Sequence, residues 1–319
     1  MRLQTGAAAP PIVMIGIPFA LGGWWPEFAD AIVGMTQAPQ GMRRLGIVER
    51  IVAADAVVGA SLRDAGDIPI QPGYRADTDP YMKNRDLIID TLPRLRDRVA
   101  DELIAGGPDA RLLALGGECT IHAAVLAAIR RARPGHRTAL VWFDAHGDFN
   151  TPDTMPGGSV WGMPFALACG RGDAGLLAAC DAPTVAEEDC ALMGGQVLDE
   201  QESRMLATSR IAHFGSGMLA TEAGMAAFVA WATVVRKRVD GFYVAFDHDA
   251  LDASGGWAVT LPEPGGLSIE TAVRAVRALA VVGPVIGFGA STISLGNGDT
   301  ARTVDATASL AAAAFATHG

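Results

Sequence analysis

The stretch TALVWFDAHGDFNTPDTMPGGSVWGM (residues 138–163) decides the fold, because its apolar run ends directly in three ligand-type side chains. Asp144, His146 and Asp148 follow at a spacing of two, and side chains at that spacing share one face of an extended chain. A second apolar run, GFYVAFD, ends in Asp247 and repeats the two-residue step at Asp249. The pattern predicts two buried strands whose ends together carry five groups that can bind metal.

Short apolar runs alternate with longer helical segments along the rest of the chain. Residues 84–106 and 121–132 have apolar side chains at helical spacing. Strands that are apolar on both faces and separated by helices are typical of a parallel sheet covered on both sides. We therefore predict an α/β fold with three layers, α/β/α, around a mostly parallel central sheet. The runs that predict its strands are PIVMIGIPFA, RLLAL, TALVWFD, SRIAHFG, GFYVAFD and GPVIGFG.

Composition sets the limits on size, partners and location. The chain has 319 residues, of which 50% are hydrophobic, and no Ser/Pro linker or charged run divides it. We expect residues 1–10 to be a flexible lead-in and residues 11–319 to form one domain. The net charge of −10 argues against nucleic acid as a partner, since phosphates require clustered Lys and Arg.

The sequence also contains no uninterrupted apolar stretch of the roughly 18 to 20 residues that a membrane span requires. Its four cysteines form no C-x-x-C pair, and no signal-peptide pattern opens the chain. These features predict a cytoplasmic protein without a membrane partner.

The residue types at the two strand ends predict metal chemistry. Carboxylates combined with an imidazole suit Mn²⁺ or another borderline-hard divalent ion, and a carboxylate can bridge two ions. Two ions about 3.5 to 4 Å apart can lower the pKa of a shared water and present hydroxide to an electrophile. The predicted cofactors are two divalent ions, with Mn²⁺ the expected metal. The alternative interpretation is that these aspartates only cap loops and helix N-termini.

Three motifs resemble those of a known family. GGECT (116–120), DAHGDFNTP (144–152) and DHDALD (247–252) are similar to the signatures GGDHS, DAHxD and DxDxxD of the ureohydrolases, the arginase and agmatinase family. The resemblance covers most of the chain and implies an arginase-like fold. It also implies hydrolysis of a C–N bond in a small guanidino or amidino compound, and assembly into trimers or hexamers.

The resemblance implies a role for each ligand-type residue. Asp144 and Asp247 would bridge the two ions, His146 and Asp249 would complete one site, and Asp148 would serve the other. Asp148 would also hydrogen-bond the metal-bound hydroxide and pass its proton to the leaving amine, so Asp148 and His146 form the predicted catalytic pair. The hydroxide would attack the guanidinium carbon and give a urea-type product plus an amine.

The first motif departs from the family pattern at the metal itself. Cys119 stands where the family has a metal-binding His, and Glu118 replaces the preceding Asp. A thiolate is soft for Mn²⁺ and would favour Zn²⁺ or Fe²⁺. Cys119 is therefore either the sixth ligand or a small buried side chain at a tight turn.

The substrate side departs as well. Asn150 matches a position that contacts the amino acid end of the substrate in the family. Trp161 replaces the His with which arginases shuttle protons, and Thr292 falls where the family has a Glu that pairs with the guanidinium. We place Asn150, Trp161 and Thr292 in the substrate site. The family's G-x-R-x-x-D element is interpreted as changed to GSGMLA (215–220).

One divergent branch shares several of these changes. The HGDFNTP loop, Cys119, His248 and the GM…ACG pattern resemble the Nω-hydroxy-arginine hydrolases of D-cycloserine biosynthesis. An N-hydroxyguanidine is less basic than a guanidine and needs less help from a carboxylate anchor. Two alternatives stay open: a catalytically degenerate relative that uses metal for structure or regulation, and a hydrolase of formimino or amide groups.

Overall fold

The computed structural model describes residues 9–23, 28–70 and 82–316, and within them one parallel sheet forms the centre of the molecule. The sheet has eight strands in the order β2-β1-β3-β8-β7-β4-β5-β6, and every neighbouring pair runs parallel. The strands are β1 (Ile12–Gly16), β2 (Leu62–Asp67), β3 (Arg111–Leu115), β4 (Thr138–Asp144), β5 (Cys190–Gly194), β6 (Ala212–Phe214), β7 (Gly241–Asp247) and β8 (Val285–Ser291).

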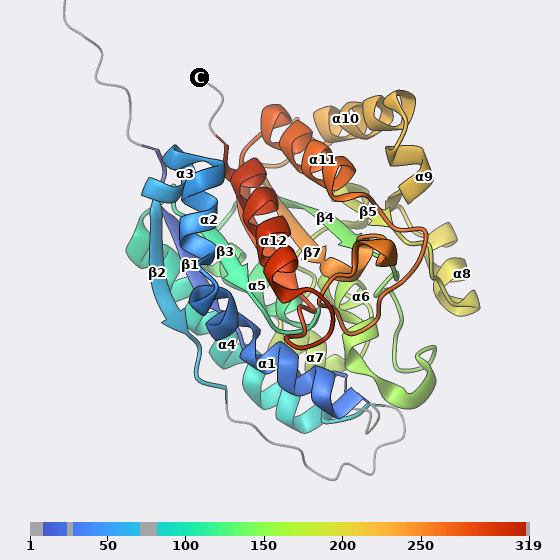
Figure 1. Cartoon of the computed structure of the whole chain (residues 1–319). Coiled ribbons are helices and arrows are strands. Elements are labelled where there is room, and N and C mark those ends of the chain that lie inside the picture. The colour runs from blue at the N-terminus through green and yellow to red at the C-terminus, as the bar shows by residue number, and fades with distance from the viewer. Residues whose placement is uncertain (1–8, 24–27, 71–81, 317–319) are drawn as a thin grey trace, which may run out of the picture.

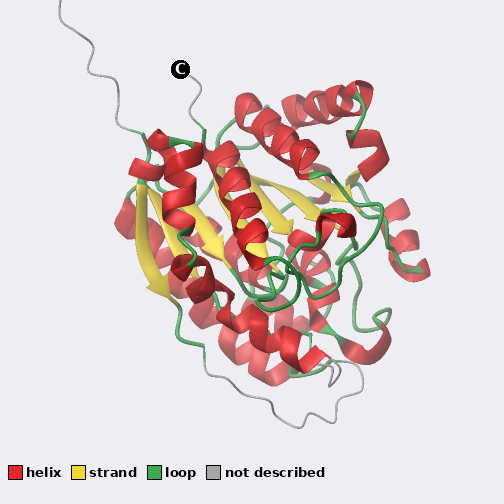
Figure 2. Ribbon diagram, viewed as in Figure 1, coloured by secondary structure: helices red, strands yellow, loops and turns green. Residues whose placement is uncertain are grey.

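Helices cover both faces of this sheet (Figures 1 and 2). One face packs against α1 (Ala29–Arg44), α2 (Ile47–Ala54), α10 (Glu222–Arg236), α11 (Ile269–Val282) and α12 (Thr300–Phe315). The other face packs against α4 (Arg85–Gly106), α5 (Ile121–Ala132), α6 (Pro164–Ala168) and α7 (Ala174–Ala179). The short helices α3 (Ala56–Ala60), α8 (Glu200–Thr208) and α9 (Ser216–Leu219) lie at the periphery. The predicted three-layer α/β/α fold is confirmed.

The central strands show why their sequences are apolar without alternation. All seven residues of β4 and all seven of β7 are buried. Val141 and Phe143 of β4 belong to the hydrophobic core on one face, whereas Leu140 and Trp142 belong to the core on the other. Because helices exclude water from both faces, every position of such a strand is selected for burial.

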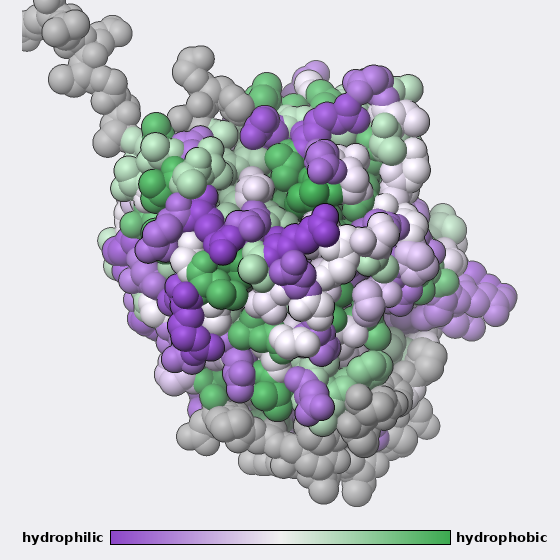
Figure 3. Space-filling model, in the orientation of Figure 1, coloured by the Kyte–Doolittle hydropathy of each residue, from purple (hydrophilic) through white to green (hydrophobic). Residues whose placement is uncertain are grey.

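Two further predictions concern the ends of the chain and the membrane. Residues 1–8 of the predicted lead-in lie outside the described residues, and a single domain over residues 11–319 stays a prediction. Among the helices of the described ranges, none combines the length and apolar character needed to cross a bilayer. The face in Figure 3 carries hydrophilic and hydrophobic residues intermixed over the helices of the front layer.

Candidate metal centre

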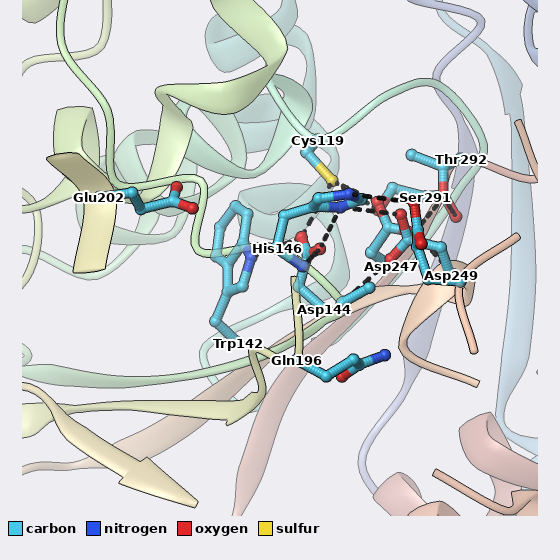
Figure 4. Close-up of polar contacts among 12 residues, drawn as sticks. Cys119, Trp142, Asp144, His146, Gln196, Glu202, Asp247, Asp249, Ser291 and Thr292 are labelled. Carbon is cyan, nitrogen blue, oxygen red and sulfur yellow. Dashed lines mark hydrogen bonds and ion pairs between the residues drawn. The ribbon is translucent and has the colours of Figure 1, made fainter. Parts of the chain in front are cut away.

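The ligand-type residues meet at the carboxyl edge of the sheet, where β3, β8, β7 and β4 lie next to one another. The register pairs Phe143 with Phe246 and Asp247 with Ser291, so the strand ends are level with each other. Figure 4 shows Cys119, Asp144, His146, Asp247 and Asp249 converging on a common point. Parallel topology therefore brings together residues that are up to 130 positions apart (119 to 249) in the sequence.

The first aspartate of each motif also holds the turn that follows its strand. Asp144 Oδ1 accepts a hydrogen bond from the His146 amide at 2.7 Å, and Asp247 Oδ1 accepts one from the Asp249 amide at 2.8 Å. Trp142 Nε1 donates to Asp144 Oδ2 at 2.9 Å. The capping interpretation thus describes part of the geometry. Since each carboxylate oxygen has two lone pairs, these bonds leave capacity for a metal ion.

Two groups of side chains are close enough to share an ion. The ligand atoms of Cys119, Asp144 and Asp148 lie within 4.8 Å of one another, as do those of Asp144, His146 and Asp249. His146 Nδ1 is 3.3 Å from Asp144 Oδ1 and 3.2 Å from Asp249 Oδ2. Asp144 belongs to both groups, which suits a residue that bridges two ions.

The electrostatics of this cluster call for positive charge. Burial, and then neighbouring carboxylates, raise the pKa of Asp144 to about 6 and the pKa values of Asp148 and Asp247 well above their ordinary range. Burial alone would lower the pKa of His146, but Asp249 and Asp144 raise it overall. Packing several carboxylates into one buried site is unfavourable unless cations compensate the charge. The donor set therefore fits divalent ions.

The Cys119 side chain contacts the ligand cluster and also belongs to the hydrophobic core of one face of the sheet. Its side chain is buried, and its Sγ donates to Asp247 Oδ2 at 2.8 Å. Burial, followed by the charges of Asp247 and Asp148, raises the pKa of the Cys119 thiol well above its usual value. Without an ion the residue is a thiol. That Cys119 binds metal, and the individual roles of the other ligands, stay predictions.

All the ligand-type residues of the cluster except Asp144 line one side of a cavity of about 230 Å³, which we call its floor. Asn150, Trp161 and Thr292, the three residues predicted to bind substrate, line this cavity. The Thr292 hydroxyl donates to Asp247 Oδ1, so it supports a predicted ligand. Apolar side chains form much of the remaining wall, namely Met155, Val197 and Leu261.

Two acidic residues of the cavity were not predicted. Asp199 and Glu202 line the wall, and Asn150 Nδ2 donates to Asp199 Oδ2 at 2.8 Å. Ser216 and Ala220 of the GSGMLA segment line a separate cavity. The sequence GGQVLD (194–199) has Gly194 and Asp199 at the spacing of the Gly and Asp in G-x-R-x-x-D, and its Asp199 lines the cavity beside the cluster.

Glu202 is held against the chain that follows β4. Its Oε1 accepts from the Phe149 amide at 3.0 Å, and burial raises the pKa of Glu202 to about 7. Asp199 caps helix α8 by accepting from the Glu202 amide at 2.8 Å. Both carboxylates are therefore fixed by backbone contacts.

Comparisons with known proteins agree with this geometry. The model of the arginase family matches residues 10–317. The arginase of Bacillus caldovelox is 30% identical over 276 residues, which cover 85% of this chain and 86% of that protein. The arginase of Bacillus subtilis strain 168 is 28% identical over 84% of this chain and 85% of its own length. The solved structure of the B. caldovelox arginase superimposes with a TM-score of 0.83 at 26% identity, covering 97% of this chain and 99% of the other.

Proposed function

The chain belongs to the arginase family, and we propose that it hydrolyses a C–N bond of a guanidino or amidino compound that also carries an ammonium group. The family match confirms the resemblance to ureohydrolases. It also confirms the expected enzyme class, a metal-dependent hydrolase of C–N bonds in amidino groups. The substrate, the metal and the role of each residue are parts of our proposal.

The observation that carries the proposal is the convergence of one thiol, one imidazole and four carboxylates at the floor of a cavity. Ions held by these groups would supply Lewis acidity and a water of lowered pKa. We propose two ions, with Mn²⁺ preferred by the carboxylates and Zn²⁺ or Fe²⁺ favoured where Cys119 binds.

Asp148 is the group best placed to move a proton. It lines the cavity, and its Oδ2 has no hydrogen-bond partner among the described residues. In the ion-free site, burial, and then Asp144 and Asp247, raise the pKa of Asp148. We propose that Asp148 takes up a proton during the attack of water and donates it to the departing nitrogen.

Asn150, Asp199 and Glu202 form a part of the cavity wall that can accept hydrogen bonds. Asn150 Nδ2 lies 2.8 Å from Asp199 Oδ2 and 3.5 Å from Glu202 Oε1, so the reversed amide would place its oxygen against two carboxylates. The Asn150 Oδ1 therefore faces away from them, and it has no partner in the described part of the chain.

Asn150, Asp199 and Glu202 thus present an amide oxygen and two carboxylates, and no Lys or Arg stands among the described lining residues. A primary ammonium supplies three donors and a positive charge, which suits this wall. The apolar side chains of Met155, Val197 and Leu261 in the same cavity suit a methylene linker.

Thr292 restricts which reactive groups of a substrate the site can bind. The family resemblance places a Glu at this position. Here the residue is Thr292, and its hydroxyl donates a hydrogen bond to Asp247. No bidentate carboxylate is therefore available at β8 for a guanidinium. We propose that the reactive group is weakly basic, such as an N-hydroxyguanidine.

We further propose that the protein forms the trimers or hexamers that its family resemblance implies.

The test is product release from the Mn²⁺-loaded protein. The substrates would be agmatine, arginine, Nω-hydroxy-arginine and 4-guanidinobutyrate, and both urea-type product and amine would be quantified. We expect turnover of the compounds that carry an ammonium group, with the highest turnover for Nω-hydroxy-arginine. The kcat/KM for 4-guanidinobutyrate, which has no ammonium group, should be at least about tenfold lower than for these compounds. Metal binding without turnover of any member would overturn the proposal and favour the degenerate alternative.

A further inference from the structure

A buried chain of hydrogen bonds ends on the sulfur of Cys119. The Tyr243 hydroxyl lies 2.7 Å from His122 Nδ1, and His122 Nε2 lies 3.0 Å from Ser291 Oγ. Ser291 Oγ in turn lies 3.4 Å from Cys119 Sγ. Tyr243, His122 and Ser291 come from β7, α5 and β8, and all three are 0% exposed. Ser291 is visible beside Cys119 and Asp247 in Figure 4.

Gly289 leaves the space that the side chains of Tyr243 and His122 occupy. A Cβ atom at Gly289 would lie 2.4 Å from the Tyr243 hydroxyl and 2.7 Å from His122 Cε1. The ring of Trp142 packs edge-on against His122 with centroids 5.1 Å apart. Only glycine at position 289 is compatible with both rings as they stand.

The direction of the hydrogen bonds follows from the groups available. Among the described residues, the Tyr243 hydroxyl has a hydrogen-bond contact with His122 alone, so the buried O–H donates to His122 Nδ1. Burial lowers the pKa of His122 to about 3, so the ring is neutral and carries its proton on Nε2. His122 Nε2 therefore donates to Ser291 Oγ.

The Ser291 proton is left with two acceptors. One is the Phe246 carbonyl oxygen at 3.3 Å and the other is Cys119 Sγ at 3.4 Å. When Cys119 is a thiol, its own proton goes to Asp247 and the Ser291 proton can go to Phe246. When Cys119 is a thiolate, its negative charge makes the sulfur the stronger acceptor.

We propose that Tyr243, His122 and Ser291 are positioning residues that stabilise the Cys119 thiolate when Cys119 binds a divalent ion. The proposal rests on metal binding by Cys119 in the proposed function. Metal ligands are held in place by hydrogen bonds from a surrounding layer, and removing such a partner typically weakens metal affinity about 10- to 100-fold. Once the Ser291 proton turns from the Phe246 carbonyl to the sulfur, every polar hydrogen of this chain points toward Cys119, which is the arrangement that an anionic ligand requires.

The test uses Co²⁺, whose bond to a thiolate gives a charge-transfer absorption in the near ultraviolet. Wild-type protein, Ser291→Ala and Tyr243→Phe would be titrated with Co²⁺ while this band and the bound metal are measured. We expect the band in all three proteins. In the two variants it should shift to longer wavelength, because the sulfur loses hydrogen-bond stabilisation, and the affinity of the thiolate-bound ion should fall about 10-fold or more.

Thr303→Val is the matched control. Thr303 is buried, and its hydroxyl accepts from the Ala258 amide at 2.8 Å and donates to the Asp299 carbonyl oxygen at 2.8 Å, so the variant also removes a buried hydroxyl but contacts no member of the path to sulfur. It should keep the wild-type band and affinity. An unchanged band and affinity in both Ser291→Ala and Tyr243→Phe would overturn the inference. Absence of the band from the wild type, together with normal hydrolysis, would overturn the inference and metal binding by Cys119, while the proposed hydrolysis stands.

Discussion

The two halves of the carboxyl edge of the sheet differ in how closely they follow the family pattern. The ends of β4 and β7 carry Asp144, His146 and Asp148 together with Asp247 and Asp249, as the motifs predict. The ends of β3 and β8 carry Cys119, Ser291 and Thr292, where the resemblance predicts a His and a Glu. The two halves touch through Asp247, which accepts hydrogen bonds from both Cys119 and Thr292.

The difference separates two parts of the chemistry. In the function that we propose, the carboxylates at the β4 and β7 ends would hold two divalent ions and move a proton. The β3 and β8 ends would set how tightly one of those ions is bound and how basic a substrate the site accepts. A change in the first half should therefore abolish hydrolysis, whereas a change in the second half should alter metal affinity and selectivity.

The largest expected effect is that of Asp148→Asn in the first half. Asparagine cannot take up and return a proton, so we expect kcat to fall about 10²- to 10⁴-fold with the fold intact. Turnover by the Mn²⁺-loaded variant and its thermal unfolding would be measured. Asp153→Asn, an exposed position of the same loop, is the matched control and should keep wild-type turnover. Full activity in Asp148→Asn would remove this residue from the mechanism.

The next largest effect concerns Cys119 in the second half. Cys119→Ala should weaken the binding of one ion about 10- to 100-fold and leave the other ion in place, because His146 and Asp249 are untouched. Cys119→His should tighten Mn²⁺ at the same site, since imidazole suits that ion better than thiolate. Calorimetric titration with Mn²⁺ gives both values. Equal Mn²⁺ affinity in the three proteins would mean that position 119 does not bind the metal.

The wall opposite the metals provides a third test. Asp199→Asn removes one negative charge and keeps the size of the side chain, so we expect KM for an ammonium-bearing substrate to rise about tenfold. The value of kcat should change much less, since Asp199 belongs to neither group of ligand-type side chains. A fall in kcat at constant KM would place Asp199 in the chemistry and contradict the binding role proposed for it.

The smallest expected effect is the pH dependence contributed by Glu202. Because burial raises the pKa of Glu202 to about 7, its carboxyl is neutral below that pH and negative above it. An ammonium binds the negative form better, so KM should fall several-fold as the pH rises through 7. Glu202→Gln should show a KM that is flat over this range and close to the acidic value of the wild type. A wild-type profile in the variant would assign the pH dependence to another group.

Much of the fold could be predicted from the sequence, because buried parallel strands have a simple signature. Two strands escaped detection. β2 lies at the edge of the sheet, and its sequence LRDAGD is largely exposed, so it has no apolar run. β5 is apolar over only five residues, CALMG, and follows directly after the acidic residues Glu187–Asp189, which hide it.

The site, like the fold, has a part that the sequence predicts and a part that it does not. The five ligand-type residues at the ends of β4 and β7 are local in sequence, so the two motifs identify them. Strand alternation is not the reason that they converge, because β4 ends at Asp144 and β7 ends at Asp247. Asp148 has a φ of 49° and Asp249 lies in the 3-10 helix His248–Ala250, so the turns after the strands aim these side chains. Asp199 and Glu202 reach the cavity from a loop and a short helix, and no periodicity marks them. The chain from Tyr243 to Cys119 joins β7, α5, β8 and the turn after β3, so only the folded arrangement reveals it.

The most direct test of the central claim is anomalous X-ray diffraction from crystals of the Mn²⁺-loaded protein. Our account predicts two anomalous peaks between the ends of β4 and β7, bridged by Asp144 and Asp247, with Cys119 facing one of them. A map with no ion within bonding distance of these two aspartates would contradict it.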